Sequence, residues 1–121
     1  MTPSEIISSN ITDADPNQVL QALAQAVKAK KAIILQEGNS VLTVFNLGGG
    51  NAEVHLFSKD SPIKLSKAVL FFVKKLEKAG VKKVYGIEPP TQILQLLKNL
   101  DIQVQDSDNP KFKWMAKVWV Y

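Results

Sequence analysis

The sequence of 121 residues contains no cysteine, no arginine and only one histidine. The missing thiols exclude a disulfide framework and a cysteine nucleophile, and one histidine cannot build a zinc site alone. No run of residues approaches the roughly 20 apolar side chains of a membrane span, and the first five residues lack the basic-then-apolar order of a signal peptide. We therefore expect a soluble, intracellular protein that holds no metal ion and does not contact a membrane.

All 15 cationic side chains are lysines, and they are unevenly distributed. Residues 1–63 carry four lysines and six acidic residues, whereas residues 64–121 carry eleven lysines and five acidic residues. Lysine is a flexible point charge and lacks the planar fork with which arginine clamps phosphate. Because the lysines are also scattered along the second half, we expect any contact with nucleic acid to be weak and non-specific.

The pattern of apolar residues predicts a short N-terminal arm, residues 1–14, followed by one domain, residues 15–121. The arm is polar and shows neither helical nor strand periodicity. The order of elements in the domain, α-β-β-β-α-β-α-β-β, indicates an α/β (α+β) fold with a mixed, mostly antiparallel sheet flanked by helices. The predicted elements are a helix 15–30, strands 32–36, 41–47 and 52–57, a helix 62–79, a strand 81–87, a helix from Pro89, and strands 102–105 and 111–121.

The third predicted strand carries two polar residues, Glu53 and His55, that can accept a proton. Side chains alternate along a strand, so Glu53 and His55 share one face about 7 Å apart. This spacing would let the pair hold an amine and take its proton. The alternative interpretation is a half-exposed strand whose polar face is solvated or contacts a neighbour.

Residues 59–66 join this strand to the next helix, where α/β proteins commonly bind an anionic cofactor. A helix start offers unpaired backbone N–H groups and the positive end of the helix dipole. Here Pro62 removes one of those N–H groups, and Asp60 adds a negative charge. The junction therefore suits phosphate less well than an ordinary helix start.

The element order, together with the segments Ala52–Ser58, Lys67–Leu70 and Leu96–Ile102, resembles the GNAT (GCN5-related N-acetyltransferase) fold. More narrowly, Glu53-Val54-His55 and Phe112–Ala116 look like the small GNAT-like proteins encoded by bacteriophages. The resemblance covers the predicted domain, and it implies that the first strand and helix of the family are missing or reduced to the arm.

The resemblance also implies a place for acetyl-CoA. The family signature Gln/Arg-x-x-Gly-x-Gly/Ala, whose glycines let the backbone close on the pyrophosphate, aligns with Ser61, Lys64 and Ser66. Both glycine roles are lost, although the side chain of Lys64 could meet phosphate. If acetyl-CoA binds, the resemblance assigns the contacts to Ser61, Lys64, Leu65 and Ser66.

Family members often protonate the leaving thiolate with a tyrosine in the following helix, preceded by an asparagine. The aligned positions hold Leu97 and Pro90, and leucine cannot donate a proton. Tyr85 is a candidate substitute. Its position on a strand equally fits a tyrosine at the edge of the core.

An interaction surface is a further possibility. On a helical wheel, Phe71 falls in the middle of a basic arc of helix 62–79, and aromatic side chains on such faces are typical of interface anchors. Alternatively, Phe71 packs under a C-terminal element. Trp119 and Tyr121 lie at the end of the last predicted strand, which as an edge strand could pair with another chain. The lysines of the basic arc are Lys64, Lys67, Lys74, Lys75 and Lys78.

Two functions compete on these grounds. The preferred one is a non-catalytic phage protein with a degenerate acetyltransferase-like fold, a structural or adaptor protein of the virion. It would need no cofactor, would form homo- or hetero-oligomers with other virion or phage proteins, and would occur in the virion or the host cytoplasm. The alternative is an acetyl-CoA-dependent N-acetyltransferase with Glu53 or His55 as its base, so enzyme activity remains open.

Overall fold

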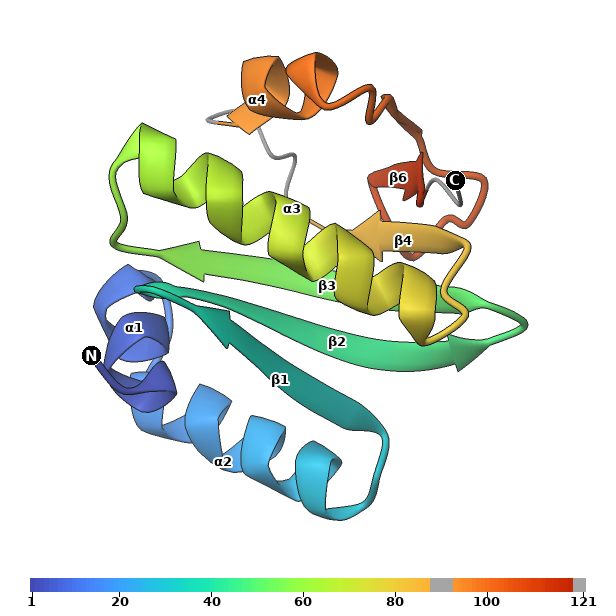
Figure 1. Ribbon diagram of the computed structural model, residues 1–121. Helices are drawn as coiled ribbons and strands as arrows, with labels where there is room; N and C mark the ends of the chain where they lie inside the picture. Colours follow the sequence, from blue (N-terminus) through green and yellow to red (C-terminus); the bar gives the residue numbers. More distant parts are fainter. Residues whose placement is uncertain (88–92, 119–121) are drawn as a thin grey trace.

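The computed structural model describes residues 1–87 and 93–118. A six-stranded sheet of order β1-β2-β3-β4-β6-β5 forms the middle of the molecule (Figure 1). Among the strands that the structure describes, only β3 and β4 pair in parallel, so the expected mixed, mostly antiparallel α+β fold is confirmed. The elements are α1 (Pro3–Asn10), α2 (Pro16–Lys28), β1 (Ala32–Glu37), β2 (Ser40–Gly48), β3 (Asn51–Ser58), α3 (Pro62–Lys78), β4 (Lys83–Gly86), α4 (Leu94–Asn99), β5 (Val104–Asp106) and β6 (Trp114–Lys117).

The N-terminal segment is not the polar surface arm expected from the sequence. Thr2 and Glu5 form a capping box, in which the Thr2 hydroxyl accepts from the Glu5 N–H at 3.2 Å and the Glu5 carboxylate accepts from the Thr2 N–H at 2.9 Å. This box starts α1 and directs Ile6 and Ile7 into the core, where they are 0% and 1% exposed. Residues 3–10 therefore form a capped helix that contributes to the core, instead of an irregular polar segment.

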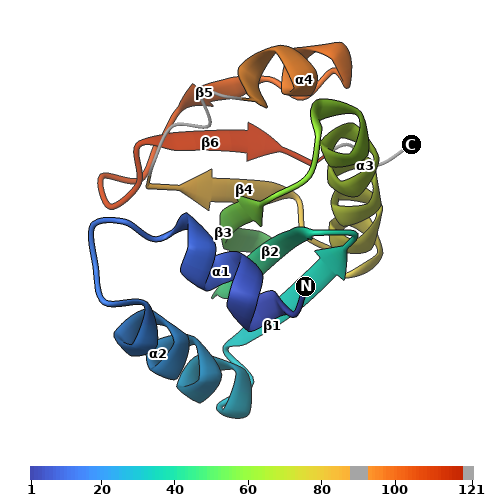
Figure 2. The same ribbon diagram turned by 90° about the vertical axis from the view of Figure 1, so that its left-hand side faces the viewer.

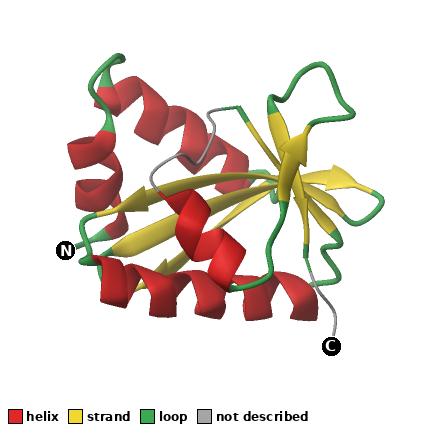
Figure 3. Cartoon of the chain, turned by 90° about the horizontal axis from the view of Figure 1, so that it is seen from above, coloured by secondary structure: helices red, strands yellow, loops and turns green. Residues whose placement is uncertain are grey.

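Helices cover both faces of the sheet (Figures 2 and 3). On one face, α1 and α2 pack on the alternating positions of β2 that include Val41 and Phe45. On the other face, α3 packs through Val69, Phe72 and Leu76, the helical spacing predicted from the sequence. A second cluster under α3 continues across β4 and β6.

The last strand is shorter than predicted and is not an edge strand. β6 lies between β4 and β5, so both of its edges are paired, and β1 and β5 are the edge strands of the described sheet. Residues 107–113 instead form a loop, in which Asn109 accepts hydrogen bonds from the N–H groups of Lys111 and Phe112. Trp119 and Tyr121 lie outside the described residues, as does the predicted helix start at Pro89 and Pro90.

β3 and β4 diverge soon after they begin to pair. Their parallel register contains three pairs and ends at Glu53 opposite Tyr85. Beyond that point β3 continues to Ser58, and no strand of the described residues pairs with its β4 side. The indole of Trp114 lies directly over Gly86 at the end of β4, where a Cβ atom would come within 2.2 Å of the ring nitrogen. The sheet is therefore open between these two strands.

Candidate functional site

A cavity of about 620 Å³ lies where β3 and β4 diverge. The residues around it include Val54 and Leu56, whose side chains lie on the α3 face of β3, and His55 and Phe57, whose side chains lie on the α1 face. The cavity therefore lies along the open edge of β3. The rest of its wall comes from Asn10, Leu42, Val69, Phe72, Val73, Leu76, Val84, Ile87, Ile93, Leu97, Ile102, Trp114, Ala116 and Val118.

Glu53 and His55 share one face of β3, as predicted, and are in direct contact. The Nε2 atom of His55 lies 2.5 Å from Oε2 of Glu53. The imidazole tautomer that donates this hydrogen bond from Nε2 to the carboxylate has Nδ1 as its acceptor nitrogen. Phe45 on β2 packs edge-on against the imidazole at 6.0 Å between ring centroids. Both side chains are partly buried, 33% exposed for His55 and 22% for Glu53, which suits a base at the wall of a cavity.

The start of α3 presents fewer anion-binding groups than an ordinary helix terminus. The first hydrogen bond of the helix runs from the Leu65 N–H to the Ser61 carbonyl at 2.8 Å, so the N–H groups of Ile63 and Lys64 precede it and have no acceptor within the helix. Pro62 contributes no N–H, and the Ser61 side chain does not cap the helix. The Ser66 hydroxyl donates to the Pro62 carbonyl at 2.9 Å.

The negative charge of Asp60 is directed away from this helix start. Its carboxylate accepts hydrogen bonds from the Asn39 N–H at 3.0 Å and from the Ser40 hydroxyl at 2.7 Å, both in the turn region between β1 and β2. Gly38 has a positive φ in the same turn, and a Cβ there would lie 3.2 Å from the carboxylate. Asp60 therefore ties this turn to the end of β3.

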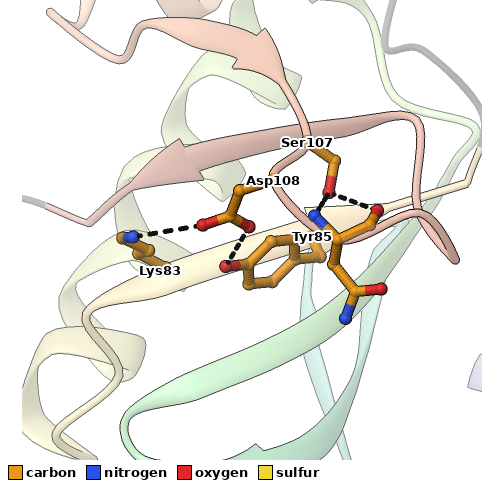
Figure 4. Close-up of polar contacts among 5 residues, drawn as sticks. Lys83, Tyr85, Ser107 and Asp108 are labelled. Atoms are coloured by element: carbon orange, nitrogen blue, oxygen red, sulfur yellow. Dashed lines mark hydrogen bonds and ion pairs between the residues drawn. The ribbon is translucent and has the colours of Figure 1, made fainter.

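Tyr85 does not line the cavity. It is 4% exposed, its ring packs on Phe112 at 5.4 Å, and its hydroxyl donates to Asp108 at 2.9 Å (Figure 4). Lys83 lies 3.7 Å from the other oxygen of Asp108. Burial, and after it the hydrogen bond to Asp108, raises the pKa of Tyr85, so the phenol is a weaker acid than usual.

These contacts make Tyr85 an anchor for the loop 107–113. In the same loop the Ser107 hydroxyl donates to the Asn109 carbonyl at 2.9 Å, and the Asn109 N–H donates back to it at 3.0 Å (Figure 4). Leu97, at the position where the family resemblance places a proton donor, does line the cavity and is 7% exposed.

The basic face of α3 carries Phe71, for which the sequence left both exposure and burial open. Phe71 is half-buried, packs against the core and has Lys75 Nζ 5.4 Å from its ring centroid, so little of the ring faces solvent. The exposed apolar side chains of this helix are Ile63 and Leu70, which are 74% and 42% exposed. On a helical wheel both fall beside the basic arc, a signal that was present in the sequence and was missed. Lys67, Lys74 and Lys78 are exposed, as expected.

The described part of the chain was searched for a metal site and for a membrane-spanning helix. Residues 1–87 and 93–118 contain no group of three or more His, Asp or Glu side chains placed to hold a metal ion. Within the same residues, every helix is too short or too polar to cross a membrane.

No protein-family model matches the chain, and no curated protein sequence is similar to it. Solved structures do match. A Bacillus subtilis acetyltransferase in complex with CoA has a TM-score of 0.58 at 13% identity, covering 97% of this chain and 91% of that one. Tetrahymena GCN5 has a TM-score of 0.64 at 9% identity, covering 98% and 85%. The PaiA N-acetyltransferase of Thermoplasma acidophilum in complex with coenzyme A has a TM-score of 0.58 at 12% identity, covering 96% and 85%.

At these identities the matches show the fold alone. The chain has the GNAT acetyltransferase fold, which confirms the fold expected from the resemblance.

Proposed function

We propose that the protein is an acetyl-CoA-dependent N-acetyltransferase. The observation that supports this most directly is the cavity at the divergence of β3 and β4, with the Glu53–His55 pair in and beside its wall. Two of the structural neighbours described above were solved with coenzyme A, which adds support for a CoA thioester as the ligand.

The residues present fit this cofactor at two places. The N–H groups of Ile63 and Lys64 and the Lys64 ammonium face the region in which a pyrophosphate would be held. The β4 side of β3 beyond Glu53 offers backbone groups to the amides of a pantetheine arm, as an open strand edge does for an extended peptide. The cofactor supplies an acyl group activated as a thioester.

The Glu53–His55 pair would perform the proton transfer. Nδ1 of His55 would take the proton that an amine loses when it is acylated by the bound thioester. Glu53 stabilises the imidazolium that forms and keeps the ring in the productive orientation. A positioned base of this kind typically contributes about 10²–10⁴-fold to a rate.

Calorimetric titration with acetyl-CoA tests the proposal, followed by a thiol-release assay over a panel of amines. A dissociation constant in the micromolar range, a higher melting temperature with the cofactor and release of CoA that depends on an amine are the expected results. Absence of binding at millimolar acetyl-CoA would rule the proposal out.

A second candidate is the non-catalytic structural or adaptor protein of a bacteriophage virion that the sequence favoured. Two observations support it: the side chains of Lys64 and Ser66 in place of glycines, and the buried Leu97 in place of a proton donor. This function requires an assembled state with copies of itself or other virion proteins, in the virion or the host cytoplasm. Light scattering at working concentration measures the assembly state, and the thiol-release assay measures turnover. A monomer that turns over acetyl-CoA would contradict this function.

A further inference from the structure

The two edge strands of the described sheet are protected to different degrees. β5 has only three residues and ends in the charged Asp106. β1, at the other edge (Figure 1), has six residues, contains no proline and keeps an unbroken register with β2. Ile33 and Ile34 lie on opposite faces of β1 and are 50% and 37% exposed, so the helices on either side leave both partly uncovered. An apolar edge strand without a proline, a bulge or an internal charge readily pairs with another strand.

The backbone of β1 has hydrogen-bonding groups that point away from β2. The Lys31 carbonyl accepts from the Asn46 N–H at 3.1 Å, which makes these two opposite residues a hydrogen-bonded pair. Such pairs recur at every second residue of an antiparallel ladder, so Ile33, Leu35 and Glu37 direct their N–H and C=O groups to β2. The alternate residues direct theirs outward, where no described residue binds them. These alternate residues are Ala32, Ile34 and Gln36.

The charges at the two ends of β1 are self-complementary. Lys31 and Glu37 stand at equal distances in sequence from Ile34; both are exposed, and neither forms an ion pair with a described residue. If a second copy of β1 runs antiparallel with a two-fold axis at Ile34, Lys31 of each copy lies opposite Glu37 of the other. The ends of the strand therefore match the ends of an identical strand.

The same register pairs the outward backbone groups. It places Ile34 opposite itself and Ala32 opposite Gln36, so every outward N–H and C=O group of the two strands meets a partner. An axis at Ile33 or at Leu35 would leave some of these groups unpaired and would separate the opposite charges. Backbone and side chains thus favour one register.

We infer that β1 is the interface of a homodimer, in which two copies join their sheets through antiparallel β1 strands centred on Ile34. Each copy has one such edge, so a two-fold pair uses both edges and assembly stops at two chains. The self-complementary ends favour a second copy over a strand of another protein. No residue of β1 is among the described residues around the cavity, so this inference does not depend on CoA binding.

Sedimentation equilibrium of the whole protein, from micromolar to millimolar concentration, measures the assembly state. A monomer–dimer equilibrium with a dissociation constant in the micromolar range is expected, and a chain that remains monomeric at millimolar concentration would overturn the inference. Ile34→Pro removes the outward N–H at the axis and no hydrogen bond to β2, so it should weaken the dimer at least about tenfold. Circular dichroism melting shows whether the variant remains folded.

Charge reversal tests the register with surface substitutions. Lys31→Glu and Glu37→Lys each place like charges opposite each other at two symmetric points, and each should weaken the dimer about tenfold at low salt. The double variant Lys31→Glu/Glu37→Lys restores both pairs and should recover the wild-type affinity. Lys74→Glu, on α3, changes the net charge as Lys31→Glu does and should leave the dimer intact. A dimer that neither single reversal weakens, or that the double variant fails to restore, would overturn the inference.

Cross-linking locates the two-fold axis. The chain contains no cysteine, so Ile34→Cys and Leu94→Cys each introduce a single thiol at a partly exposed position. In the dimer the two residues at position 34 lie about 5.5 Å apart between Cα atoms, within reach of a short bismaleimide. Cross-linked dimer is expected from the variant at position 34 and not from the variant at position 94, on α4. Equal cross-linking of both variants would indicate random collision and contradict the inference.

Discussion

The two faces of the sheet are packed differently. On the α1 and α2 side, the core is tightly closed, with Ile6, Ile7 and Val41 at most 1% exposed. On the α3 and α4 side, the buried residues around the cavity range from Ala116, which is 1% exposed, to Val54, which is 8% exposed, and a cavity of about 620 Å³ lies among them. The two faces therefore differ in packing: among the described residues, the cavity lies mainly against the α3 side, where a ligand has space.

The polar groups follow the same division. Glu53, His55 and Tyr85 all project from the first face, and each has a hydrogen-bond partner there. The second face contributes apolar wall and the lysine-rich helix α3. The opening between β3 and β4 connects the two, so a bound thioester would meet a base from one face and a hydrocarbon wall from the other.

The largest effect is expected from the base. Glu53→Gln and His55→Asn should each lower the rate of amine-dependent CoA release by about 10²–10⁴-fold, because proton removal from the amine is lost or misdirected. The dissociation constant for acetyl-CoA should change little in both variants. If each variant loses binding and rate to the same extent, the pair stabilises the fold or binds the cofactor instead of acting as a base.

The contrast in packing predicts unequal costs for truncation. Ile7→Ala should lower the free energy of unfolding by about 3–5 kcal/mol, since it leaves a new cavity in a closed core. Leu97→Ala should cost about 2 kcal/mol or less, because it enlarges a cavity that already exists and loses only the transfer free energy of the removed atoms. Urea unfolding of both variants measures the difference, and equal costs would remove the distinction between the faces.

The hydrogen bond from the Tyr85 hydroxyl to Asp108 on the first face can be tested by removing the hydroxyl. Tyr85→Phe should cost about 0.5–1.5 kcal/mol of unfolding free energy at neutral pH, the usual net value of one hydrogen bond. In this variant Asp108 still pairs with Lys83 and is partly exposed to water, so its charge is not left buried without a partner.

The same variant carries a pH signature. The pKa of Tyr85 in the folded protein is raised above its ordinary value of 10.0, so the neutral phenol is favoured by folding. Its contribution is fully present below about pH 10 and is lost as pH rises through the folded-state pKa. The stability difference between the wild type and Tyr85→Phe should therefore shrink above pH 10, and a difference independent of pH would contradict this account.

The sequence predicted the architecture well where local signals were strong. The cap at Asp15 followed by Pro16, the turn at Gly38 and the apolar stripe of α3 each agree with the structure. The alternation along β3 likewise placed Glu53 and His55 together. These features depend on short-range periodicity and on turn or capping residues, which can be recognised in a single sequence.

Other features depend on long-range pairing. The capping box of α1 was legible in Thr2 and Glu5, but the burial of Ile6 and Ile7 requires β2 and α2 to be placed. The position of β6 between β4 and β5 could not be read from its own residues, which are equally compatible with an edge strand. The cavity is a property of where β3 and β4 separate, and no local pattern specifies that point.

The smallest effect concerns the phosphate end of the candidate site. Lys64→Ala should weaken acetyl-CoA binding by about two- to fivefold at low salt, since an exposed lysine contributes only a modest charge interaction with phosphate. The loss should diminish at high ionic strength because the charges are screened. Lys74→Ala removes an equivalent exposed charge about 15 Å farther along α3 and should have no effect on binding. If both variants weaken binding equally, the helix acts through its overall charge, and the start of α3 is not a phosphate site.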